Sequence, residues 1–223
     1  KQLLDDAKSP VVVIGLEAAR SICTSELREF VTQLGAPVLC TYMAKGCVAD
    51  SNPHFAGLFT GGAIEQDCMN SADLIVLIGL DPVELIRKPW AYTTPTLDLC
   101  ERIYDPHYLT PNVRVAGPLA ITLHALAKTI SASTWQTDII ANFKASFIRG
   151  MEEGGSAELS SASVVKAVRD HFSGTPRLAV DAGSHMFSAC AFWPAKAPND
   201  LLISNGLASM GFAVPAAIAA ALH

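Results

Sequence analysis

A chain of 223 residues, 50% hydrophobic and 17% charged, can bury a sizeable core, which excludes a disordered or coiled-coil protein. Its net charge is −5 and its Lys and Arg residues are scattered, so neither nucleic acid nor a membrane surface is expected as a partner. The six cysteines lack metal-binding spacing, and we expect free buried thiols in a reducing cytoplasm and no metal site.

The first half of the chain alternates buried strands with amphipathic helices. The run Pro10–Ile14, stopped by Gly15, predicts a strand buried on both faces. A helix follows, with Thr24 as its N-cap and Gly35 at its end. Further elements are a helix over 64–70, a helix from Pro118 at its first position, and strands over 37–41, 72–79, 96–100 and 113–116. Short connections make these strands parallel, so residues 1–133 are predicted to form a doubly wound α/β domain.

Small polar residues mark a linker, 134–157, that carries one amphipathic helix over 137–150. Residues 158–223 are then predicted to form a second α/β domain. It has a helix capped by Ser163, strands over 177–181 and 201–204, and a last helix from Gly211. This helix meets no stop signal, so we expect the second domain to be truncated. Polar and helix-breaking residues interrupt the apolar stretch 206–222, which favours a packed helix over a membrane span.

Several turns in the first domain carry only weak functional signals. The turn at Gly15 has one of the three glycines of a dinucleotide-binding turn, and it can equally just end a strand. The Gly57–Gly62 loop is compatible with phosphate or with a plain connection. Asp81 follows a strand end, where it can bind a ribose hydroxyl or form an Asp-Pro turn, the commoner arrangement. Surface or hydrogen-bonded positions are expected for His54, His107, His124 and His171.

The specific signal lies in two segments near the end of the chain. Asp181–His185 has the pattern Asp-x-Gly-x-His, and residues 204–217 have the pattern Ser-x-Gly-x-x-x-Met-Gly-x-x-x-Pro-Ala-Ala. Both resemble the start of the pyrophosphate domain of thiamine-diphosphate-dependent enzymes of the acetohydroxyacid synthase and benzoylformate decarboxylase type. Segments 35–38, 42–46, 52–57 and 72–79 appear in the order of that family's middle domain, so the resemblance covers nearly the whole chain.

The resemblance implies roles for five cofactor-binding residues. Thiamine diphosphate must be held with its two rings folded toward each other. By resemblance, Met210 is the apolar wedge under this bend, and the carbonyl of Ala208, next to Ser209, accepts from the amino group. Ser184 and His185 match positions that contact the diphosphate. Core packing for Met210 and a structural role for His185 are the alternatives, and no catalytic residue is assigned.

The implied activity is carboligation or decarboxylation of a 2-keto acid, hence a transferase or lyase. The full-length enzyme would use thiamine diphosphate with Mg²⁺ as a cytoplasmic homodimer or homotetramer. The family's magnesium motif would follow residue 223, and its activating glutamate lies in a preceding domain, so the isolated chain is expected to be inactive. FAD is not expected, because the Gly15 turn is not glycine-rich. The alternatives are an FAD- or NAD-binding module, or a structural domain without catalysis.

Overall fold

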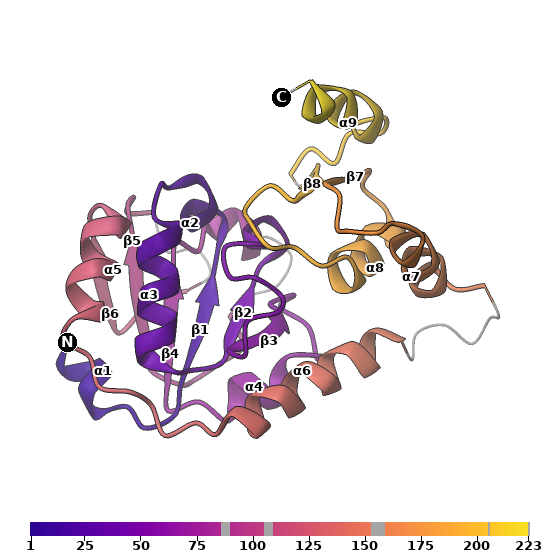
Figure 1. The fold of residues 1–223 in the computed structure, drawn as a ribbon. Coiled ribbons are helices and arrows are strands. Elements are labelled where there is room, and N and C mark those ends of the chain that lie inside the picture. Colours follow the sequence, from indigo (N-terminus) through magenta and orange to yellow (C-terminus); the bar gives the residue numbers. More distant parts are fainter. Residues whose placement is uncertain (86–89, 105–108, 153–158, 205, 223) are drawn as a thin grey trace.

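A six-stranded parallel sheet forms the centre of the computed structural model, which describes residues 1–85, 90–104, 109–152, 159–204 and 206–222 (Figure 1). The strand order is β3-β2-β1-β4-β5-β6. The strands are β1 Pro10–Ile14, β2 Val38–Cys40, β3 Phe55–Leu58, β4 Leu74–Ile78, β5 Thr96–Cys100 and β6 Val113–Ala116. The order runs outward in both directions from the β1/β4 pair, in which Val11 lies opposite Ile75. The predicted doubly wound α/β fold is therefore confirmed.

Helices cover both faces of this sheet. Val12 and Ile14 of β1 pack in one apolar cluster with helices α3 (Thr24–Leu34) and α5 (Leu119–Ala127). Val11 and Val13 point the other way, into a cluster with α4 (Gln66–Asn70) and part of α6 (Thr137–Glu152). Alternate residues of one strand thus serve opposite faces, as a central parallel strand requires. Short helices are α1 Gln2–Asp6, α2 Leu16–Arg20, η1 Tyr42–Ala44 and η2 Pro82–Leu85.

The edge strand β3 was not predicted from the sequence, which favoured a loop from Gly57 onward. Its sequence, Phe-Ala-Gly-Leu, is short and lacks β-branched residues, so it carries little strand signal. Helix α6 packs along this strand, and its Phe147 ring lies 2.8 Å from where a Cβ on Gly57 would be. A glycine at this position therefore lets the helix approach the strand closely.

A second, two-stranded parallel sheet pairs β7 (Leu178–Val180) with β8 (Leu201–Ile203). Helices α7 (Ser161–His171), α8 (Ser184–Phe192) and α9 (Ala213–Ala221) accompany it, and α9 projects from the molecule with no buried residue (Figure 1). Helix α8 was not predicted. The proposed linker contains the packed helix α6, and its residues 153–158 lie outside the described part, so the domain boundaries stay a prediction. Among the described helices, none has the length and apolarity to cross a membrane.

Three predicted helix starts were wrong by one to three residues. Thr24 is the first residue of α3, and Cys23 before it is the N-cap, with no side-chain capping bond. Pro118 is the N-cap of α5, not its first helical residue. Ser163 is not the cap of α7, because Ser160 takes that position and the two serines form a reciprocal capping box.

Ser160→Ala is therefore expected to destabilise the chain by about 1 kcal/mol, the usual cost of losing an N-cap side chain. The Ser160 hydroxyl accepts from the Ser163 N–H at 3.1 Å, and this donor would lose its partner. Urea unfolding measures the change. Ser131→Ala, at an exposed loop position, is the control and should change the free energy of unfolding by less than about 0.5 kcal/mol. Equal effects of the two substitutions would contradict the capping role.

Candidate functional site

The first of the two C-terminal segments leads from β7 into α8. Ser184 and His185, expected on a turn, are instead the first two residues of α8, and both are exposed. Gly183 is the N-cap and has a φ of 153°, while the His185 ring comes within 2.8 Å of where a Cβ on Gly183 would lie. The turn is therefore closed tightly over the glycine, and both candidate cofactor-binding side chains lie at the helix N-terminus.

Asp181 connects this segment to the second one. Its carboxylate accepts from the Ala213 N–H at 2.8 Å and from the Gly211 N–H at 3.3 Å, so it caps the N-terminus of α9. A carboxylate at this place also compensates the positive end of the helix dipole. Asp181 is not among the site residues predicted from the sequence, although it is the first residue of the Asp-x-Gly-x-His pattern. The two sequence motifs thus meet in space through one side chain.

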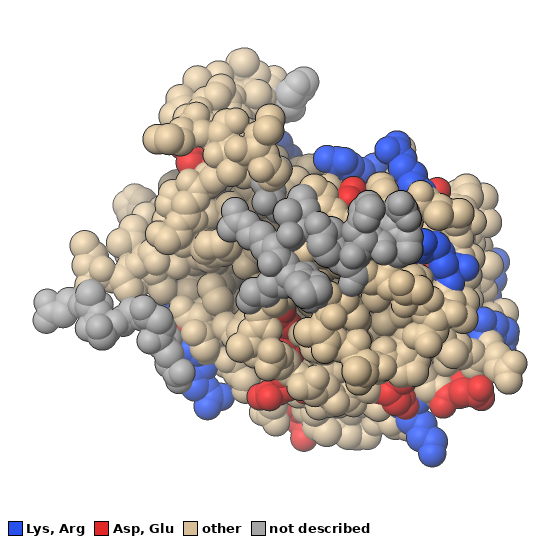
Figure 2. Space-filling view, turned by 180° about the vertical axis from the view of Figure 1, so that it is seen from behind, with Lys and Arg blue, Asp and Glu red and all other residues tan. Residues whose placement is uncertain are grey.

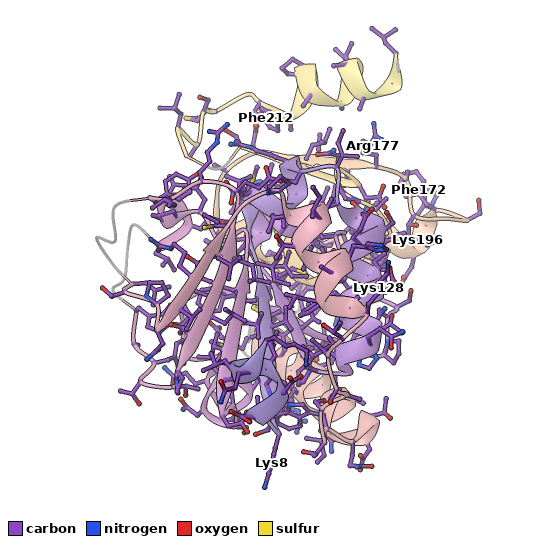
Figure 3. The ribbon with its side chains drawn as sticks, turned by 90° about the vertical axis from the view of Figure 1, so that its left-hand side faces the viewer. Lys8, Lys128, Phe172, Arg177, Lys196 and Phe212 are labelled. Atoms are coloured by element: carbon purple, nitrogen blue, oxygen red, sulfur yellow. The ribbon has the colours of Figure 1, made fainter. Side chains whose placement is uncertain are left out.

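The second segment presents apolar side chains to the outside. Met210 and Leu207 are both 95% exposed, so Met210 is not packed in the core of the described structure. Ala208 has a φ of 50°, and the Ser209 N–H donates to the Ser204 hydroxyl at 3.2 Å. Residues 201–222 contain no Asp, Glu, Lys or Arg, and Figure 2 shows the projecting part as almost uniformly uncharged. In Figure 3, Phe212 at the base of α9 lies at the opposite end of the molecule from Lys8, which precedes β1.

In the middle domain, a carboxylate already fills the turn at Gly15. Glu84 accepts from the Leu16 N–H at 2.8 Å and from the Asp81 N–H at 3.1 Å. A Cβ on Gly15 would lie 2.7 Å from the same carboxylate oxygen, so the glycine leaves room for this side chain. Burial raises the pKa of Glu84 to about 7, although the N–H donors lower it. In doubly wound folds this turn is where a nucleotide phosphate binds, and here the chain's own acidic group occupies it.

The Gly57–Gly62 loop is filled in the same way. The buried Glu65 side chain accepts from the Thr60 N–H at 3.1 Å, the Thr60 hydroxyl at 2.9 Å and the Gly62 N–H at 2.9 Å. The Thr60 and Gly62 N–H groups, which a phosphate could have used, are therefore satisfied internally. Of the two alternatives left open for this loop, the geometry favours a structural connection.

The other weak candidates take the structural arrangement as well. Asp81 accepts from the Val83 N–H at 2.9 Å, which is the predicted Asp-Pro turn. His124 is half-exposed, with its Nδ1 3.7 Å from a Glu29 carboxylate oxygen. His54 is the exception: its Nδ1 is buried without a hydrogen-bond partner among the described residues, and burial lowers its pKa. His107 lies outside the described residues. Within the described ranges, no three His, Cys, Asp or Glu side chains are placed to hold a metal ion.

Comparison with known proteins decides the family. Residues 1–126 match the family model described as "Thiamine pyrophosphate enzyme, central domain", and residues 181–223 match "Thiamine pyrophosphate enzyme, C-terminal TPP binding domain". The first match alone covers more than half of the chain. The chain belongs to the thiamine pyrophosphate enzymes. It comprises their central domain and the start of their cofactor-binding domain, as the resemblance implied.

Curated relatives of this thiamine pyrophosphate enzyme chain are acetolactate synthases. The large subunit of Corynebacterium glutamicum acetolactate synthase is 26% identical over 98% of the chain and 37% of the relative. The catabolic acetolactate synthase of Raoultella terrigena is 29% identical, covering 98% and 41%, and that of Bacillus subtilis is 25% identical, covering 98% and 40%. The chain therefore spans about two fifths of the length of these relatives. The match to the TPP-binding domain begins at Asp181, the residue that joins the two motifs.

Proposed function

We propose that the chain is part of a cytoplasmic enzyme that binds thiamine diphosphate with Mg²⁺ and acts on 2-keto acids. The relatives named acetolactate synthase favour carboligation over simple decarboxylation. We further propose a transferase that works as a homodimer or homotetramer. A nucleotide-binding or purely structural module explains the middle domain but gives no reason for the paired C-terminal motifs.

The observation that carries this proposal is the hydrogen bonding of Asp181. Its two bonds to the Gly211 and Ala213 N–H groups hold the segment around Met210 against the end of β7. Ser184 and His185 begin α8 soon after β7 ends, so they lie at the same end of the strand as Asp181. Side chains that suit the diphosphate end and the ring end of one cofactor are thereby brought to one end of one small sheet.

Thiamine diphosphate, when bound, supplies a carbon nucleophile that attacks a 2-keto carbonyl and then accepts the electrons of the broken bond. The chain's part is to bind and to orient. Ser184 and His185 would donate to the diphosphate, the Ala208 carbonyl would accept from the amino group, and Met210 would hold the rings folded. Covering Met210 and Leu207 with an apolar ring system would also remove a large exposed apolar surface from water.

We also propose that the middle domain of this enzyme binds no FAD. The Glu84 carboxylate occupies the turn at Gly15, and a pyrophosphate placed there would meet a buried negative charge above pH 7. The single glycine of the turn agrees with this. Purified full-length protein should therefore lack flavin absorbance at visible wavelengths, and a yellow protein with bound flavin would refute the proposal.

Calorimetry on the full-length protein tests the main proposal. Thiamine diphosphate with Mg²⁺ should bind with micromolar affinity, about −8 kcal/mol, and pyruvate should be consumed. Residues 1–223 alone should bind at best in the millimolar range, about −4 kcal/mol, because their described part offers no metal site. These assignments would be contradicted by full-length protein that shows no binding of thiamine diphosphate, or by a chain of 223 residues that turns over pyruvate.

A further inference from the structure

One segment of the middle domain, residues 42–50, contacts helix α8 near both of its ends. We call this segment the junction loop. The ring of Tyr42 lies 5.5 Å from the ring of Phe187, in the first turn of α8. The Asp50 N–H donates to the Ala195 carbonyl at 3.0 Å, just beyond the C-terminal end of α8. The helix therefore lies along the loop, with one contact at each end.

Helix α8 is also largely buried between these two contacts. Cys190 is fully buried, and burial is the main reason that the pKa of its thiol is raised to about 12. The charge of Lys45 lowers the pKa of this thiol and that of Asp50 raises it, each by less than burial does. Six of the nine residues of α8 are buried, so the helix is enclosed and has little freedom to shift by itself.

A buried ion pair holds the two halves of the junction loop together. The Lys45 ammonium lies 2.5 Å from an Asp50 carboxylate oxygen, and the Lys45 side chain is 1% exposed. Lys144 of α6 donates to the Asp50 carbonyl. Separating the buried charges would leave each one without its partner, which is strongly unfavourable. The loop is consequently a rigid surface for α8 to rest on.

Arg28 of α3 binds the loop and the chain after α8 at the same time. Its guanidinium donates to the Cys47 carbonyl at 2.9 Å, the Gly46 carbonyl at 3.0 Å and the Lys196 carbonyl at 2.6 Å. Figure 3 shows Lys196 on the same side of the molecule as the end of α5 at Lys128. One side chain thus ties three carbonyls from two distant segments into a fixed arrangement.

At Gly46 the backbone of the loop runs close to the backbone after α8. It has a φ of +91°, and a Cβ there would lie 2.0 Å from the Ala197 carbonyl oxygen and 2.5 Å from its carbon. Both atoms belong to the backbone, so a side chain would push the two segments apart.

We propose that the junction loop positions helix α8, and with it Ser184 and His185, for the cofactor diphosphate. Gly46 and Arg28 are positioning residues: they touch the chain that follows the helix, at Ala197 and Lys196, and act on the cofactor only through it. This inference rests on the proposed function for the identity of the ligand. The middle domain of this enzyme, with its nucleotide turn filled by Glu84, then serves as the support for the cofactor-binding helix.

The test compares Gly46→Ala with Gly35→Ala in the full-length enzyme. Both glycines have left-handed backbones, with φ of +91° and +65°, so both substitutions carry a similar backbone strain. A Cβ on Gly35 meets nothing closer than 3.8 Å, whereas one on Gly46 meets the chain after α8. Gly46→Ala should raise the Kd for thiamine diphosphate, measured calorimetrically with Mg²⁺, more than tenfold. Gly35→Ala should leave it within twofold of the unmodified enzyme.

Hydrogen exchange of the cofactor-free enzyme provides a second measurement. Amides of residues 184–192 should exchange at least tenfold faster in Gly46→Ala and at an unchanged rate in Gly35→Ala.

If Gly46→Ala does not fold, Arg28→Met is the deciding variant, with Arg20→Met on the exposed end of α2 as its control. We expect at least a threefold rise in Kd for Arg28→Met alone. Equal Kd values and equal exchange rates in a folded variant and its control would overturn the proposal. Unmodified enzyme that does not bind thiamine diphosphate would overturn the proposed function, while the exchange rates would still decide whether the loop positions α8.

Discussion

Met210→Ala in the full-length enzyme is expected to lower the turnover rate about a hundredfold at saturating thiamine diphosphate. Truncating a methionine that supports another group removes roughly 3 kcal/mol of packing, and that amount placed wholly on the transition state gives this factor. The Kd of the cofactor should change less, because the diphosphate contacts remain. The melting temperature of the 223-residue chain should not change, because Met210 is 95% exposed there.

Met210→Leu is the matched control. It nearly keeps the volume and the apolar character of the side chain, so turnover should fall only slightly. Steady-state rates per bound cofactor and thermal unfolding of the same variants separate a wedge from a core residue. A normal rate per bound cofactor in a destabilised Met210→Ala enzyme would refute the wedge assignment.

Glu84→Gln should remove a pH dependence from the stability of the chain. The folded-state pKa of Glu84 is about 7, above its ordinary value of 4.5, so the folded state retains a proton that the unfolded state releases. This contribution is fully present below pH 4.5 and is lost as the pH rises through 7. Between pH 5 and 8 the unmodified chain should lose roughly 2 to 3 kcal/mol relative to Glu84→Gln.

Urea unfolding followed by circular dichroism at several pH values measures this difference. Burial also raises the pKa values of Glu17, Asp50 and Asp98, and these groups titrate alike in both proteins, so they cancel in the comparison. Glutamine still offers one oxygen to the Leu16 N–H, which keeps the turn intact. A stability difference that stays constant with pH would mean that Glu84 is not held as a buried acid.

The middle domain was largely predictable because the residues of its central strands carry a clear local strand signal. The runs at 11–14 and 74–78 are continuous and β-branched or leucine-rich, so their burial on both faces fixes a parallel sheet. Strand β3 and helix α8 were missed for opposite reasons. The first contains Gly57 and lacks β-branching. The second is apolar on nearly all sides, because it is enclosed, and so shows no helical periodicity.

The contacts that decide the candidate site are not local. Glu84 reaches Leu16 across 68 positions, and Asp181 reaches Ala213 across 32. Neither contact leaves a periodic pattern, and the motif resemblance was the signal that pointed to the C-terminal segments. The filled turn at Gly15 needed the structure, since a single glycine there is compatible with an open or an occupied turn.

The burial of the thiols has a practical consequence for following this protein in solution. All six cysteines are free and buried, and burial raises the pKa of each, to about 11 for Cys23 and about 12 for Cys47 and Cys68. Alkylating reagents attack the thiolate, so the folded chain should be nearly silent toward them. A short exposure to maleimide should then label only unfolded molecules. The added mass of six labels distinguishes these molecules from the folded, unlabelled ones in a mass spectrum. Because the native thiols do not react, a cysteine introduced at the surface would be the only attachment point for a fluorophore. None of the six native cysteines would have to be replaced.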